Sequence, residues 1–350
     1  MGIRGSVPPA EQDRSPPGPA DAAGIFTPPV PAAPDCGWIF PGLCGRLRRK
    51  LSDPDPPPVP LPLPEAVVII PHYNDVVRLG RCLAALAPQL TAAGDRVEVI
   101  VVDNSSTQSL DPVRAAWPDL RIVTETKKGA AEARNRGVAE TTAQRIFFLD
   151  CDCVPAPDWL ETAFTVMGRA DVIGGRIDVF DETPGPRSGA EAFEAVFAFD
   201  NRGYVEKKGF SVTANLLTRR DVFEATGPLI HGLSEDLDWC RRATAKGYTL
   251  VYEDRLRVSH PSRSDWAALV KKWRRVTDES FGVNGKGPQR RAVWAAKALA
   301  MPASVLAHAP KVLRHSGLKP EEKRAGLAML ARLRLARMGW MLRQAATGRV

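Results

Sequence analysis

The chain has 350 residues, of which 44% are hydrophobic and 25% are charged, as expected for a globular protein with a sizeable core. No run of about 18 apolar residues occurs, so we expect no membrane span, and no apolar segment predicts a signal peptide. The six cysteines form no CxxC pair and no Cys/His cluster. We therefore expect reduced thiols in a cytoplasmic protein, without structural zinc.

The charge is distributed unevenly along the chain. Residues 261–350 carry 19 Lys and Arg against 5 Asp and Glu, a balance of +14, whereas residues 1–260 carry 29 against 35, a balance of −6. A basic end predicts peripheral contact with a polyanion such as the inner face of a membrane. Nucleic acid is not an expected partner, because neither an aromatic-basic RNA signature nor Cys/His finger spacing occurs.

Residues 1–64 hold 17 of the 31 prolines, a composition that predicts a largely disordered or extended segment. One island interrupts it: the aromatic and aliphatic residues from Cys36 to Phe40, followed by a basic cluster that ends at Lys50. This island could dock on a membrane interface or pack against the protein itself.

From Ala66 onward, short apolar runs alternate with helical patterns. The expected strands cover residues 67–70, 97–102, 121–123 and 146–149, and a helix is expected over 130–139. Such alternation is typical of βαβ units and a mostly parallel sheet. Polar residues follow the first, second and fourth of these strands, at the carboxyl ends where open α/β sheets bind ligands.

The fourth apolar run stops at two acids, Asp150 and Asp152. With an extended backbone between them, both carboxylates would point to one side and reach one divalent cation and its phosphates. The alternative is that they only begin a turn before Pro155. No GxGxxG follows the first strand and no P-loop lysine motif occurs, which argues against a Rossmann dehydrogenase and a P-loop enzyme.

Several sequence motifs follow one another along the chain, and their order is informative as well as their residues. They are VVIIPHYN at 67–74, VIVVDNSS at 99–106, GAAEARNRG at 129–137, LDCD at 149–152, VTANL at 212–216 and LSEDLDW at 233–239. Together they resemble the family 2 glycosyltransferases over about residues 66–280. The resemblance implies an α/β fold of the GT-A type, with a mostly parallel central sheet and flanking helices. The implied domains are a Pro-rich extension at 1–64, a catalytic domain at 65–284 and a basic amphipathic helical region at 285–350.

The resemblance also implies the chemistry. In that family a nucleotide-sugar donor passes its sugar, with inversion, to a hydroxyl of a glycan or lipid-linked acceptor. A carboxylate takes the proton of the hydroxyl, and Mg²⁺ or Mn²⁺ neutralises the departing diphosphate. Asp236 would be the base, with Glu235 orienting it. The structural alternative is a helix start at Ser234, where acids are favoured by the helix dipole.

Further roles follow from the same resemblance. The implied nucleotide and donor ligands are Pro71, Tyr73, Asn74, Asp103, Arg134, Asp150 and Asn215, and the implied metal ligands are Asp150, Asp152 and His260. Each has a structural alternative: a turn residue for Asp103, a solvated helix face for Arg134, a structural histidine for His260 and a buried amide satisfied by backbone for Asn215.

Beyond residue 285 the chain is expected to be helical and basic. Residues 292–313 are broken by Pro302 and Pro310 and are too interrupted to span a bilayer. Over 327–343 apolar residues alternate with arginines, a pattern that suits an interfacial helix or packing against the catalytic domain.

Two rival functions remain at this point. A sugar nucleotidyltransferase would usually need a Gly-rich basic loop after the first strand, where Pro71 to Asn74 stand instead. A non-catalytic scaffold at the membrane is disfavoured by the paired acids at 150 and 152 and at 235 and 236.

Overall fold

The computed structural model describes residues 63–232, 234–284 and 287–349. The Pro-rich segment and its island at 36–50 lie outside the described residues. Eight strands of the described chain form one sheet in the order β3-β2-β1-β4-β7-β6-β8-β5. They are β1 (Ala66–His72), β2 (Val97–Asp103), β3 (Arg121–Thr124), β4 (Arg145–Leu149), β5 (Val154–Pro155), β6 (Val172–Phe180), β7 (Asn215–Arg219) and β8 (Leu250–Pro261).

The sheet is mixed but mostly parallel. β1 pairs in parallel with β2 and β4, β2 with β3, and β6 with β8, whereas β7 runs antiparallel to both β4 and β6. Because β7 reverses direction between two strands that point the same way, the carboxyl ends of β1, β2, β4, β6 and β8 share one edge. The start of β7 meets them there, through the bond from Asp150 N to Ala214 O (3.4 Å).

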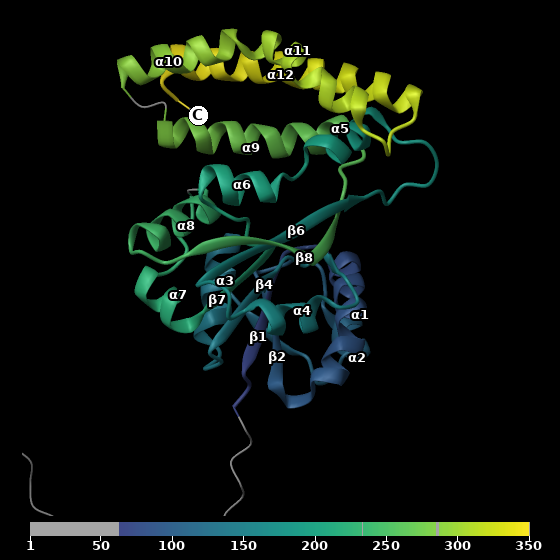
Figure 1. Ribbon diagram of the computed structural model, residues 1–350, viewed down its shortest axis with the longest axis vertical. Helices are drawn as coiled ribbons and strands as arrows, with labels where there is room; N and C mark the ends of the chain where they lie inside the picture. The colour runs from purple at the N-terminus through teal and green to yellow at the C-terminus, as the bar shows by residue number, and fades with distance from the viewer. Residues whose placement is uncertain (1–62, 233, 285–286, 350) are drawn as a thin grey trace, which may run out of the picture. The chain divides into compact units, whose positions relative to one another are not determined.

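Helices cover both faces of the sheet (Figure 1). In chain order they are α1 (Val76–Ala93), α2 (Asp111–Ala116), α3 (Ala130–Ala139), α4 (Trp159–Val166), α5 (Gly189–Phe197), α6 (Asn201–Lys208), α7 (Arg220–Thr226) and α8 (Glu235–Ala245), with a short 3₁₀ turn at Gly94–Arg96. Helices α1, α2 and α4 pack on one face, and α3, α7 and α8 pack on the other.

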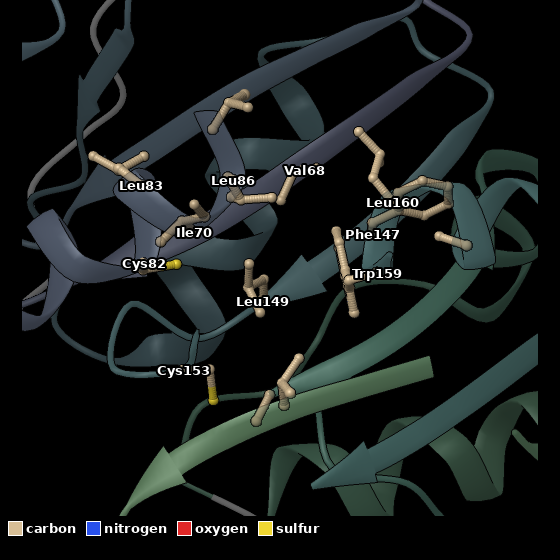
Figure 2. Packing of buried hydrophobic residues seen from close by; sticks show 14 of the residues in the cluster. Val68, Ile70, Cys82, Leu83, Leu86, Phe147, Leu149, Cys153, Trp159 and Leu160 are labelled. Carbon is tan, nitrogen blue, oxygen red and sulfur yellow. The ribbon is translucent and has the colours of Figure 1, made fainter. Parts of the chain in front are cut away.

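The central strands β1 and β4 are continuously apolar over residues 66–70 and 146–149 because each face is covered. Alternate residues of β1 and β4 enter opposite cores, since side chains along a strand point to alternate sides. Figure 2 shows one of these cores, where Val68, Ile70 and Leu149 lie opposite Cys82 of α1. The predicted strands and the helix over 130–139 are confirmed. The first strand continues through Pro71 and His72, two residues beyond its predicted end at 70.

Four further helices follow the sheet: α9 (Trp266–Asn284), α10 (Pro288–Leu299), α11 (Met301–Arg314) and α12 (Pro320–Thr347). α12 packs against α5, α9, α10 and α11. Its apolar residues Leu330, Leu333 and Met341 are buried, so packing, rather than an interfacial face, accounts for the amphipathic pattern over 327–343. Among the described helices, none alone has both the length and the apolar character to cross a bilayer. Only α10 and α11 taken together, bent by 50°, meet that test of length and composition.

The contact between α3 and β1 gives a stability prediction. A Cβ atom on Gly137 would lie 2.4 Å from Cγ2 of the buried Ile69, so Gly137→Ala is expected to cost about 1–3 kcal/mol through overpacking. Gly80 in α1 has no atom within 4 Å of such a Cβ, so Gly80→Ala should stabilise by about 0.5–1 kcal/mol. Urea unfolding of both variants measures the difference; equal effects would contradict the packing described here.

Candidate active site

Arg134 is the cation around which the acids of the sheet edge gather. Helix α3 carries it inward, and the residue is only 4% exposed. Its Nη2 donates to Oδ1 of Asp150 (2.5 Å), directly after β4, and its Nη1 donates to Oε1 of Glu235 (3.4 Å), at the start of α8. The solvated helix face that was the alternative for Arg134 is therefore wrong.

The guanidinium of Arg134 stays protonated. Burial alone would lower the pKa of Arg134, but nearby carboxylates, those of Asp150, Asp236 and Glu235, raise it above its ordinary value. A buried cation among three acids offsets the repulsion that they would otherwise exert on one another.

Asp236 lies beside this cluster, at the second position of α8. Its Oδ1 accepts hydrogen bonds from the backbone N (3.2 Å) and the Oγ1 (2.7 Å) of Thr213, just before β7. Burial raises the pKa of Asp236 to about 6, with Arg134 acting in the opposite direction. A carboxyl group with a pKa close to neutral is suited to take a proton.

The other acid in the first turn of α8 behaves differently. Asp238 accepts from Nε of Arg242, four residues on (2.8 Å), and so is engaged within its own helix. Ser234 makes no side-chain bond to the helix end. The first-turn acids Glu235 and Asp236 are thus drawn to Arg134 and Thr213 as well as favoured by the helix dipole.

Asp150 and Asp152 do not point to the same side. The backbone turns between them, closed by the bond from Cys153 N to Asp150 O (3.0 Å), so the extended geometry assumed from the sequence is wrong. Asp150 faces Arg134, whereas Oδ2 of Asp152 lies 3.1 Å from Nε2 of His260, at the end of β8. Within the described residues, no group of three or more His, Cys, Asp or Glu side chains is arranged to hold a metal.

The pair of Asp152 and His260 nevertheless has suitable donor atoms for a cation. Nδ1 of His260 lies 2.7 Å from the carbonyl oxygen of Pro261, which only accepts, so Nδ1 carries the proton. Nε2 is then turned toward Asp152. Burial raises the pKa of Asp152, but the adjacent imidazole of His260, which donates to this carboxylate when Nε2 is protonated as well, lowers it below the ordinary value. A carboxylate and an imidazole nitrogen fit a divalent cation whose remaining ligands are phosphate oxygens or water.

At the ends of β1 and β2, His72 fixes the position of Asp103. The backbone N–H of Asp75 donates to Nε2 of His72 (3.1 Å), so Nδ1 carries the proton and donates to Oδ1 of Asp103 (3.1 Å). The backbone N of Ser106 donates to the other oxygen, Oδ2 (3.3 Å). His72 was not among the residues predicted for the site, although its position at a strand end beside Tyr73 could have indicated it.

The neighbouring residues of this loop have distinct roles. Oδ1 of Asn74 accepts from the backbone N–H groups of Thr107 (2.7 Å) and Gln108 (3.1 Å), so Asn74 ties the loop after β1 to the loop after β2. Tyr73 is exposed and Pro71 is half-buried within β1. Of the three residues predicted to line the nucleotide pocket here, Tyr73 is the one whose side chain projects into solvent.

Asn215 is a structural amide. The residue is fully buried: its Oδ1 accepts from Nε1 of Trp159 (2.9 Å), and its Nδ2 donates to the carbonyl oxygens of Arg176 (3.0 Å) and Leu256 (2.9 Å). Its polar atoms are used within the protein, as the alternative for this residue required. We therefore assign Asn215 no contact with the donor sugar.

A cavity of about 690 Å³ opens next to Asp152 and His260, with α9 as one wall. Lys272 and Arg263 line it and share the buried carboxylate of Glu194, at 3.0 and 2.9 Å. Burial lowers the pKa of Lys272 to about 8, although Glu194 opposes the shift. Within the basic run at 271–275, Lys272 is therefore turned inward to Glu194.

The chain was compared with known proteins. Residues 67–227 match the family described as Glycosyl transferase family 2. Glycosyltransferase AglE of Haloferax volcanii is 32% identical over 216 residues, which cover 59% of this chain and 70% of that protein. The chain belongs to glycosyltransferase family 2. It is a glycosyltransferase, and its mostly parallel sheet with flanking helices confirms the GT-A fold expected from the sequence.

Two further glycosyltransferases have a lower sequence identity to this chain. The pre-mycofactocin glycosyltransferase of Mycobacterium tuberculosis is 28% identical over 222 residues, which cover 58% of this chain but only 45% of that protein. The solved structure of the mannosyltransferase PcManGT from Pyrobaculum calidifontis, in complex with GDP-Man and Mn²⁺, is 21% identical with a TM-score of 0.47. That match covers 86% of this chain and 79% of the other.

Replacing Arg134 tests the electrostatics of the site. Arg134→Gln leaves the acids facing one another, so it should lower the free energy of unfolding by about 3 kcal/mol at pH 8. The loss should shrink toward pH 5, because protonation of Asp236, whose pKa rises further without the cation, relieves the repulsion. Arg136→Gln, an exposed ion-pair loss on the same helix, is the control and should cost less than about 1 kcal/mol. A pH-independent loss at Arg134 would contradict this account.

Proposed function

We propose that this glycosyltransferase is an inverting, metal-dependent enzyme that passes a sugar from a nucleotide donor to a hydroxyl of a glycan or lipid-linked acceptor. The observation that carries the proposal is the position of Asp236. Thr213 holds one oxygen of its carboxyl group, and Arg134 links the neighbouring Glu235 to Asp150 at the end of β4. This arrangement supports a role for Asp236 as the base, beside the edge where the strands would deliver the donor-side residues.

The proposed reaction is a single displacement. The free oxygen of the Asp236 carboxylate takes the proton of the acceptor hydroxyl, and the acceptor oxygen forms its bond to the anomeric carbon. The bond from that carbon to the donor phosphate breaks at the same time, and its electron pair leaves with the nucleoside diphosphate. Because attack and departure occur on opposite faces, the anomeric configuration inverts.

Arg134 acts as a positioning residue in this proposal. Its positive charge opposes the rise in pKa that burial causes at Asp236, so that most of the base is ionised near pH 7. Its bonds to Asp150 and Glu235 keep the end of β4 and the start of α8 in register. It therefore couples the donor side of the site to the acceptor side.

A divalent cation, Mg²⁺ or Mn²⁺, would be held by Asp152 and His260. Asp150 would lie nearby, bonded to Arg134. When bound, such an ion acts as a Lewis acid that neutralises the charge developing on the diphosphate. Tyr73, which is exposed, would stack on the nucleotide base, and Asp103, oriented by His72, would accept hydrogen bonds from the base or ribose.

The acceptor would enter through the cavity beside Asp152 and His260. Helix α9 forms one wall of that cavity through Lys272 and Arg275. Burial raises the pKa of Glu279, one turn beyond Arg275, and the nearby charge of Glu235 adds to the rise. Thus α9 runs from the proposed metal ligands toward the base and flanks the path of an acceptor.

The base is tested by Asp236→Asn, with release of nucleotide from a panel of UDP-, GDP- and dTDP-sugars as the assay. The variant should lose about 10²- to 10⁴-fold in kcat and keep its nucleotide affinity. The wild-type rate should rise with pH through about 6, because only the deprotonated carboxyl group accepts a proton, and the variant should lack that rise.

Asp238→Asn is the matched control, since Asp238 lies in the same helical turn but bonds to Arg242. Its rate should stay within about twofold of wild type, as expected for a surface substitution. Wild-type activity in Asp236→Asn would remove Asp236 from the reaction and leave the family assignment intact.

A further inference from the structure

Helices α10 and α11 expose an apolar face that the transfer reaction does not use. Four of the nine large exposed hydrophobic residues in the described chain lie on these two helices. They are Val293 (55%), Leu299 (66%), Leu306 (79%) and Leu313 (53%). The smaller exposed residues between them are alanines and prolines, with Lys297 and Lys311 among them. We call this surface the α10–α11 face; in Figure 1 both helices lie beyond α9, away from the sheet.

The opposite side of both helices is fixed to the protein. Trp294, Ala298 and Val312 are buried. Nε1 of Trp294 donates to Oε1 of Gln344 in α12 (3.1 Å), and Nε of Arg291 donates to the carbonyl oxygen of Ala345 (2.6 Å). A helix packed on one side normally presents a polar stripe to water on the other. Here the outer side exposes four large hydrophobic residues and several alanines and prolines, and a concentration of exposed apolar residues marks an interaction site.

The charge around this face selects the partner. Residues 280–320 contain seven Lys and Arg and no Asp or Glu. Lys297, Lys311 and Arg314 are exposed on the same two helices. Long cationic side chains can lay their stems along apolar surface while their heads reach phosphate groups. An apolar face whose own two helices carry cations and no acids is complementary to the surface of an anionic bilayer.

The helices are shaped to lie on a bilayer rather than to cross it. α10 has 12 residues and α11 has 14, which at 1.5 Å per residue gives lengths of about 18 and 21 Å, short of a hydrocarbon core of about 30 Å. The two are bent by 50° at their junction, and their inner sides are already packed. Only the outer face is available to lipid.

We propose that the α10–α11 face docks the enzyme on the surface of an anionic lipid bilayer. The four large hydrophobic residues enter the boundary between headgroups and acyl chains, and the exposed cations bind lipid phosphates. This places the membrane contact on α10 and α11, not on the residues 327–343 that the sequence favoured, because the apolar side of α12 is buried. The proposal is independent of the reaction proposed above.

The test is co-sedimentation of the full chain with vesicles, which needs no knowledge of the substrates. Wild type should bind vesicles of phosphatidylcholine that contain about one third phosphatidylglycerol. Its affinity for vesicles of phosphatidylcholine alone should be at least about tenfold lower. Salt at about 0.5 M should weaken the binding, because it screens the cations. Absence of binding to the anionic vesicles would overturn the proposal.

The double variant Leu299→Glu with Leu306→Glu places two acids on the face. It should bind the anionic vesicles at least about tenfold more weakly, with an unchanged melting temperature, since both side chains are exposed. Val77→Glu makes the same kind of change at an equally exposed site of α1 and should bind as wild type does.

Two results of this variant would overturn the proposal. The double variant could bind as tightly as wild type, which would show that the face does not contact lipid. Alternatively, light scattering could show that wild type is a dimer and the double variant a monomer while vesicle binding is unchanged. That outcome would assign the face to a second copy of the chain.

Discussion

The buried guanidinium of Arg134 is the interaction on which the site depends. Three carboxyl groups approach it from two parts of the chain, and its charge opposes the rise in pKa that burial causes at Asp236. By joining Asp150 to Glu235 it also joins the half of the sheet that follows the nucleotide-binding pattern to the half that carries the proposed base. One residue thereby ties the two halves of the edge together and opposes the effect of burial on the pKa of Asp236.

Most of the fold could be predicted because its signals are local. Continuous apolar runs mark β1, β2 and β4, since both faces of these strands are covered, and the helix over 130–139 begins and ends where the sequence placed it. The contacts of α12 could not be predicted in the same way. An amphipathic basic helix has the same sequence whether its apolar side meets lipid or protein, and only the position of α5 and α9 decides between them.

The site was predicted as a set of residues but not as a set of contacts. Arg134 and Glu235 are 101 residues apart in the chain, and Lys272 and Glu194 are 78 apart, so no local pattern reports either pair. Asp150 and Asp152 have different partners because the backbone turns between them. The sequence was interpreted as an extended strand, which does not predict this turn. Chemistry-bearing residues can be read from motifs, whereas their partners require the packed structure.

The central claim is that this sheet edge binds a nucleotide through a metal held at Asp152. Calorimetric titration with UDP, GDP and dTDP, each with and without Mn²⁺, tests it directly on wild type and Asp152→Ala. Asp221→Ala, which removes an exposed acid of α7, is the control. We expect one nucleotide to bind wild type and the control only with Mn²⁺, and at least about tenfold more weakly to Asp152→Ala. Two results would contradict the account: a nucleotide affinity that is the same with and without Mn²⁺ and in wild type and Asp152→Ala, or no nucleotide binding at all.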